Sequence, residues 1–124
     1  MRFRLTARQH LRNGREFETV RRHGRAFQGA PFLFTLFIPE LDEGSVPVCR
    51  LGVIASRRVG NAVVRNRCKR ICRELFRKHQ HSLPPHCDCV FLVRKKFPDF
   101  RFEDLEKKFV QAYQYLTLPK RPTK

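Results

Sequence analysis

Acidic residues, long apolar runs and paired cysteines are all scarce in this sequence. Asp and Glu total 11 against 27 Lys and Arg, which gives a net charge of +16 over 124 residues. The longest apolar run, FLFTLFI at residues 32–38, is too short to span a bilayer and is rich in strand-forming residues. The polar, basic start of the chain also differs from a secretory signal. We therefore expect a cytoplasmic protein with no membrane partner, and the excess positive charge favours a polyanionic ligand.

The five cysteines are odd in number and form no CxxC pair, which suits a reducing compartment. Cys68, Cys72, Cys87 and Cys89 could together offer four soft ligands to zinc. The alternative is that Cys68 and Cys72 are small apolar residues on a buried helix face and that Cys89 points inward from a strand. Without a CxxC pair we expect the second arrangement and no metal site.

Groups of residues suited to catalysis are also missing. A protein nuclease needs carboxylates around metal ions, or histidines paired for acid–base work. Glu40, Asp42 and Glu43 fall in a loop, and the carboxylates of residues 99–106 suit the start of a helix. The histidines of the proline-rich stretch 79–86 are typical of a solvated loop. We therefore expect no catalytic residue in the chain, and a zinc-dependent nuclease is the alternative.

The chain has the organisation of one domain over residues 1–124, with flexible tails at 1–9 and 118–124. The order of elements is α-β-β-α-β-α, with the first strand divisible in two, and it predicts a small α+β sandwich. The acidic loop at 39–47 predicts a hairpin between the strands that flank it. The expected elements are a helix from Asn13 to Gly24, a strand over 27–38 interrupted near 29–31, a strand over 48–56, a helix from Asn61 that ends before Pro84, a strand over 88–94 and a helix over 102–116.

The sequence GNAVVRNRCKRICRELFRK at residues 60–78 predicts a strongly amphipathic helix. At about 100° per residue, Val64, Cys68, Ile71 and Leu75 fall within an arc of roughly 60° and predict a buried stripe. The opposite side extends over about 18 Å of helix axis and is basic. It consists of Arg65, Asn66, Lys69, Arg70, Arg73 and Arg77.

This basic face has two interpretations. Most charged helix faces are only solvated exteriors. Here, however, Glu74 is the only acidic residue between Ser56 and Lys78, and neighbouring guanidinium groups match phosphates in spacing and geometry. RNA is favoured over duplex DNA because no helix-turn-helix, zipper or zinc finger is recognisable. The expected RNA contacts are Arg57, Arg58, Arg65, Asn66, Arg67, Lys69, Arg70, Arg73 and Arg77.

The segment SRRVGNAVVRNRCKR at residues 56–70 resembles the signature of the bacterial ribonuclease P protein subunit. RELF at 73–76, HLRNGREFETVRRHG at 10–24 and the runs FLFTLF and RLGVIAS follow the family's order and spacing, so the resemblance covers nearly the whole chain. It implies a mixed sheet packed by helices, with a left-handed β-α-β crossover. It also implies a subunit of an endoribonuclease whose RNA, rather than its protein, removes the 5′ leader from precursor tRNA.

The resemblance implies the partners as well. They are the catalytic RNA of ribonuclease P and the 5′ leader of precursor tRNA, with no obligate protein partner. Mg²⁺ would be required by the RNA, and the protein would hold no cofactor tightly. A structural protein that binds ribosomal RNA, which would share the charge and the type of fold, is the alternative.

Members of this family hold the leader in a cleft between the sheet and the first helix, and Phe17 stands where an aromatic cleft residue is expected. Aromatic rings stack on unpaired bases of any identity, although Phe17 could equally be a core residue. Many relatives have a second aromatic residue where this chain has Arg21, which could hold a phosphate. Strand alternation leaves open which face of residues 32–37 lines the cleft. We expect the leader to contact Phe17, Arg21, Phe32, Phe34, Lys69 and Arg73.

Overall fold

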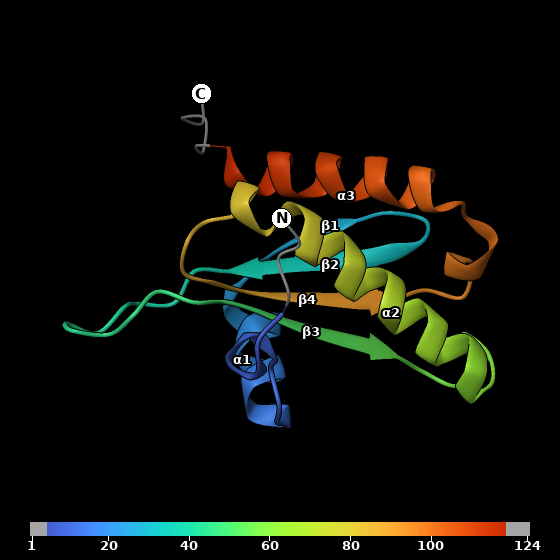
Figure 1. The fold of residues 1–124 in the computed structure, drawn as a ribbon. Helices are drawn as coiled ribbons and strands as arrows, with labels where there is room; N and C mark the ends of the chain where they lie inside the picture. Colours follow the sequence, from blue (N-terminus) through green and yellow to red (C-terminus); the bar gives the residue numbers. More distant parts are fainter. Residues whose placement is uncertain (1–4, 119–124) are drawn as a thin grey trace.

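The computed structural model describes residues 5–118, and every expected helix and strand is present there (Figure 1). The strand expected over 27–38 is divided in two. Short 3-10 turns occupy Ala7–Gln9, Gln80–Ser82 and Phe97–Asp99. The main elements are α1 (Gly14–His23), β1 (Arg25–Gln28), β2 (Phe32–Phe37), β3 (Cys49–Ala55), α2 (Ala62–His79), β4 (Cys87–Val93) and α3 (Phe102–Thr117).

The strands form one sheet in the order β1-β2-β4-β3. β2 pairs antiparallel with β1 and with β4, whereas β3 pairs parallel with β4. The expected α+β fold with a mixed sheet is confirmed. The hairpin expected across loop 39–47 is wrong, because β4 lies between β2 and β3. β4 is buried along nearly its whole length, because a strand pairs with each of its edges and helices pack on both faces of the sheet.

Helices cover the two faces of the sheet differently (Figure 1). α2 and α3 lie on one face, where their apolar side chains and those of the strands form the main core. α1 lies on the other face over a small cluster of Leu11, Val20 and Val90, with Phe17 packed against it. In Figure 1, α2 lies in front of the sheet while the chain passes from β3 up to β4, so the crossover has the left-handed sense that the resemblance implies. Nearly all β-α-β crossovers are right-handed.

Asparagine caps begin α1 and α2, as the sequence predicts. Asn13 Oδ1 accepts the Glu16 N–H at 2.9 Å, and Asn61 Oδ1 accepts the Val64 N–H at 3.0 Å. α1 ends at Gly24, where a Cβ would lie 2.6 Å from the carbonyl oxygen of Val20. The missing side chain lets the backbone turn directly from α1 into β1.

Residues 5–9 belong to the stretch expected to be a flexible tail, but they pack against the sheet. Leu5 contacts the main core, and Gln9 Nε2 donates to the Cys49 carbonyl oxygen at 3.2 Å and to Gln80 Oε1 at 2.7 Å. Of the other tail residues, Leu118 follows α3 and is exposed, and residues 1–4 and 119–124 lie outside the described residues. Among residues 5–118, no helix is long and apolar enough to cross a membrane.

Candidate nucleic-acid interface

α2 buries one side and exposes the other. Cys68, Cys72, Leu75 and Phe76 are buried in the main core, whereas the predicted stripe members Val64 and Ile71 are only partly buried. The side of α2 that is buried is therefore rotated about the helix axis from the predicted stripe, toward Cys72 and Phe76. The expected RNA contacts lie on the remaining surface of α2 and just before it. Arg57, Arg58, Asn66, Arg67, Arg70 and Arg73 are exposed, and Arg65, Lys69 and Arg77 are half-buried.

Few of these cations pair with a carboxylate of residues 5–118. Arg77 pairs with Glu74 one turn earlier, with its Nε 3.0 Å from Glu74 Oε2, and Lys78 pairs with Glu106 at 2.9 Å. The rest of the face keeps its charge available for an external anion. Within residues 5–118, no carboxylate lies within ion-pair distance of Arg57, Arg58, Arg65, Arg67, Lys69, Arg70 or Arg73.

Arg65 is distinct among these residues because part of its guanidinium is covered. Its Nε is the one buried side-chain nitrogen or oxygen in the described part of the chain that has no hydrogen-bond partner. A buried donor without an acceptor costs about 1–3 kcal/mol. An anionic oxygen that reached this nitrogen would remove that cost.

A second feature lies on the opposite face, between α1 and the sheet. A cavity of about 160 Å³ opens there. Ile54 at its rim is 41% exposed, which is unusual for a large apolar strand residue. α1 and the sheet thus enclose a mostly apolar groove of the kind that the resemblance implies. Its lining residues are Gly14, Phe17, Glu18 and Arg21 from α1, Leu33 and Thr35 from β2, Ile54 from β3, and Val90 and Leu92 from β4.

Phe17 takes its position because β3 has no side chain beneath the ring. A Cβ on Gly52 would lie 2.4 Å from Phe17 Cε1 and 2.5 Å from Phe17 Cζ. A glycine inside a strand often marks such a close approach. The half-buried ring therefore rests on the backbone of β3 while part of its surface lines the cavity.

Arg21 also lines the cavity, but it already has a carboxylate partner. Its Nη2 lies 2.6 Å from Glu18 Oε1 and its Nε lies 2.9 Å from Glu18 Oε2. These hydrogen bonds raise the pKa of Arg21 and lower the pKa of Glu18. Since both side chains are exposed, the pair is weak, and a phosphate at Arg21 would compete with Glu18.

Two phenylalanines that we assigned to the leader lie elsewhere. Phe32 and Phe34 are 0% exposed and point into the main core, where Phe34 packs edge-on against Phe109. Because successive strand residues alternate in direction, it is Leu33 and Thr35 that face α1. The assignment of Phe32 and Phe34 to the cleft is therefore wrong.

Lys69 and Arg73 do not line the cavity either. Both belong to α2, which packs on the sheet face opposite α1 (Figure 1). The structure leaves them on the basic face of α2 alone. The two surfaces approach one another at the end of β3, where Ile54 lines the cavity and Arg57 and Arg58 follow before α2 begins.

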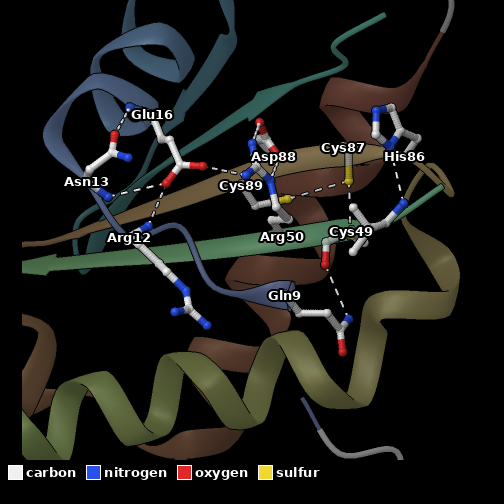
Figure 2. Close-up of polar contacts among 11 residues, drawn as sticks. Gln9, Arg12, Asn13, Glu16, Cys49, Arg50, His86, Cys87, Asp88 and Cys89 are labelled. Atoms are coloured by element: carbon white, nitrogen blue, oxygen red, sulfur yellow. Dashed lines mark hydrogen bonds and ion pairs between the residues drawn. The ribbon is translucent and has the colours of Figure 1, made fainter. Parts of the chain in front are cut away.

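A charged network ties α1 to the sheet (Figure 2). Arg50 Nε and Nη2 each lie 2.8 Å from a carboxylate oxygen of Asp88, and Arg50 Nη1 lies 2.5 Å from Glu16 Oε2. The hydrogen bonds to Asp88 are the main cause that raises the pKa of Arg50. The backbone N–H of Arg12, followed by Arg50, lowers the pKa of Glu16. The network holds the helix that carries Phe17 in place over the sheet.

Residues 5–117 match the family model described as Ribonuclease P. The chain belongs to this family. The ribonuclease P protein component of Desulfotalea psychrophila is 38% identical over 96 residues, covering 77% of this chain and 76% of that protein. The corresponding component of Bacillus pumilus is 30% identical over 110 residues and covers 89% of each.

Solved structures of ribonuclease P proteins share the fold. The protein from Thermotoga maritima has a TM-score of 0.67 at 28% identity and covers 82% of this chain and 92% of that chain. The protein from Staphylococcus aureus has a TM-score of 0.74 at 20% identity, covering 88% and 95%, which shows the fold alone. Membership of the Ribonuclease P family supports a role in tRNA processing with RNA binding.

In this member of the Ribonuclease P family, most residues of the cavity wall are not predicted from the sequence. Leu33, Thr35, Ile54 and Leu92 line it, but alternation alone leaves either face of a strand free to do so. Gly52 is the one signal in the sequence that could have located the wall, because an interior strand glycine indicates that another group packs on it.

Proposed function

We propose that this chain is the protein component of ribonuclease P and that it binds the catalytic RNA of that enzyme through the basic face of α2. The observation that carries the proposal is a row of cations that no carboxylate of residues 5–118 neutralises. Arginine binds phosphate with two parallel hydrogen bonds. The buried side of α2 fixes the helix in place, so little order is lost when an RNA backbone docks on it. The row is Arg65, Arg67, Lys69, Arg70 and Arg73.

The 5′ leader of precursor tRNA binds on the other face, beside Phe17. Support comes from the open side of the ring and from the apolar wall that Leu33 and Ile54 add. Unpaired bases stack on such a ring whatever their identity, which suits a leader of variable sequence. Arg57 and Arg58 lie between the cavity and α2, where they can contact the backbone that leaves the cavity.

In this proposal the RNA performs the hydrolysis and uses Mg²⁺, while the protein positions RNA and leader in the cytoplasm. Support comes from how the carboxylates are used: Glu16 and Asp88 both pair with Arg50, and Glu106 pairs with Lys78. Among residues 5–118, the one group of three or more potential metal ligands consists of cysteines. A two-metal hydrolytic site needs grouped carboxylates instead.

The test is cleavage of precursor tRNA by the catalytic RNA at low Mg²⁺, with and without the purified protein. We expect stimulation by the wild type and its loss when Arg65, Lys69, Arg70 and Arg73 are all replaced by Gln. A control variant with Gln at four exposed cations near and on α3 changes the net charge equally and should keep the stimulation. The control positions are Lys95, Lys96, Arg101 and Lys107.

Each result has a separate meaning. No stimulation by the wild-type protein rejects the proposed function. Equal loss in both variants rejects the α2 face as the RNA site. If the protein retrieves ribosomal RNA from cells, rather than one catalytic RNA with precursor tRNA, the structural ribosomal alternative replaces the proposal.

A further inference from the structure

Three cysteines from β3 and β4 point toward one another in the core (Figure 2). Cys49 and Cys87 are register partners in the parallel ladder, and Cys89 lies on the same face of β4. Cys87 Sγ lies 3.0 Å from Cys49 Sγ and 3.8 Å from Cys89 Sγ. All three sulfur atoms lie within 4.8 Å of one another.

Buried cysteines are usually no more than small apolar side chains. Cys68 and Cys72, buried on α2, fit that description. The other three are different because their sulfur atoms face each other, and Cys49 and Cys87 are closer than two sulfur atoms in ordinary nonbonded contact. Neutral thiols gain little from this arrangement, since S–H is a weak donor and sulfur a weak acceptor.

The triangle of sulfur atoms has the size that a metal ion requires. Two sides of 3.0 and 3.8 Å and a third of up to 4.8 Å place the point equidistant from all three atoms about 2.0–2.4 Å from each. A metal–thiolate bond measures about 2.3 Å. Three sulfur atoms at that distance in a trigonal arrangement are about 4.0 Å apart. The 3.8 Å side already fits, and Cys49 Sγ and Cys87 Sγ must separate by about 1 Å to admit the ion.

The ligand count indicates which ion fits. Within residues 5–118, the group of His, Cys, Asp and Glu in mutual reach consists of these three residues alone. His86 precedes Cys87, but its Nδ1 accepts the Val48 N–H at 3.1 Å. Structural zinc almost always has four ligands. Three thiols favour a soft ion of lower coordination number, and Cu(I) is the thiophilic ion that fits this description.

The cysteine group lies beside an open cavity, and hydrogen bonds support its backbone. Cys49 lines an open cavity of about 360 Å³ between the N-terminal turn and the loop that follows α2. Gln9 Nε2 holds the carbonyl oxygen of Cys49, and the Cys87 N–H donates to the carbonyl oxygen of Val48 at 3.3 Å. The site therefore adjoins solvent at Cys49, which is 8% exposed, whereas Cys87 and Cys89 are 0% exposed, and the backbone on both strands is held in position.

We infer that Cys49, Cys87 and Cys89 form a binding site for one soft metal ion, with Cu(I) as the fitting ion. The bound ion would join β3 to β4, the two strands that α2 connects, and would stabilise the sheet beneath the basic face. This site differs from the zinc site considered from the sequence, which would combine Cys68 and Cys72 with Cys87 and Cys89. It also departs from our expectation that the chain holds no metal site.

The test uses the reduced full-length protein and Cu(I) without oxygen, in competition with a chromogenic Cu(I) chelator. We expect one equivalent of copper, sulfur-to-copper charge-transfer absorption and a higher melting temperature. Cys49→Ala should lower the affinity by at least about 100-fold, because one of three ligands is lost and even loss of a residue that only supports a ligand costs about 10–100-fold. Cys72→Ala removes an equally buried thiol outside the triangle and should leave the affinity unchanged.

The inference is overturned if the wild type takes no Cu(I) from the chelator, or if Cys49→Ala binds as tightly as the wild type. A Cys49–Cys87 disulfide that is already present in the purified protein and resists reduction before copper is added would also overturn it. If an alanine variant does not fold, X-ray absorption of the copper-loaded wild type decides the matter: three sulfur neighbours at about 2.3 Å support the site, and two or none reject it. None of these measurements uses RNA, so they are independent of the proposed function.

Discussion

Gly52→Ala should weaken the fold because the added methyl group meets the ring of Phe17. The new Cβ would lie 2.4 Å from Phe17 Cε1, whereas ordinary van der Waals contact begins at 3.4 Å. The ring must therefore move by about 1 Å, and Leu11, 3.2 Å from the same Cβ, restricts the movement on one side. Overpacking of this kind costs about 1–3 kcal/mol. We expect a fall of that size in the free energy of unfolding, measured by urea denaturation.

The cost should depend on the Phe17 ring, which a double-mutant cycle can show. Phe17→Ala alone removes a half-buried ring and should cost about 2 kcal/mol, less than the 3–5 kcal/mol of a fully buried one. Gly52→Ala should cost little in that background, so the coupling free energy should be about 1–3 kcal/mol. Gly14→Ala is the matched control, because its Cβ would meet nothing within 4 Å although Gly14 also lines the cavity.

The same variants test whether the cavity holds the leader. A displaced Phe17 ring should weaken binding of precursor tRNA to the reconstituted enzyme but leave binding of mature tRNA unchanged. Stacking of one base is worth about 1–3 kcal/mol, which corresponds to a loss of between about 5-fold and 150-fold. The reasoning is refuted if Gly52→Ala is as stable as the wild type, or if it costs as much with Phe17→Ala as without it.

Two further predictions concern stability. Arg50→Met leaves the Asp88 carboxylate, which is 6% exposed, without its main partner. The free energy of unfolding, measured by urea denaturation, should fall by about 2–4 kcal/mol, which is less than for a fully buried pair because Arg50 is 28% exposed. A fall of less than about 1 kcal/mol would contradict this prediction. The Glu106 pKa lies below its usual value of 4.5, chiefly through the hydrogen bond with His79 and then through Lys78. Its stabilising effect is therefore present above about pH 5 and lost as the pH falls through the lowered pKa, so the advantage of wild type over Glu106→Gln should shrink in acid. An advantage that is constant from pH 7 to about pH 3 would argue against this assignment.

The helices are predictable because their signals are local. Asn13 and Asn61 begin α1 and α2, and both caps make the expected hydrogen bonds. Cys68 and Leu75 are buried as their spacing predicts. The signals for these features lie within a turn or two of one another, so they can be recognised in the sequence. The sheet beneath α2 still decides which side is buried, and it turns the buried side toward Cys72 and Phe76.

The errors concern contacts between distant parts of the chain. The expected hairpin between β2 and β3 fails because β4, later in the sequence, inserts between them. The cleft assignment fails at Phe34 because Phe109 of α3 covers that face of β2. Likewise, the approach of Cys49 to Cys87 depends on the register of β3 against β4. Pairing and register of this kind are set by the whole fold rather than by local pattern.

The salt dependence of holoenzyme assembly tests the central claim most directly, namely that the basic face of α2 binds RNA phosphates. The slope of log Kd against log salt reports how many phosphates a protein neutralises, at about 0.7–0.9 per contact. Replacing Arg65, Lys69, Arg70 and Arg73 with Gln should reduce that slope by about 3–4 and weaken binding most at low salt. A slope equal to that of the wild type, or a reduction of the same size in the Lys95, Lys96, Arg101 and Lys107 control, would contradict the account.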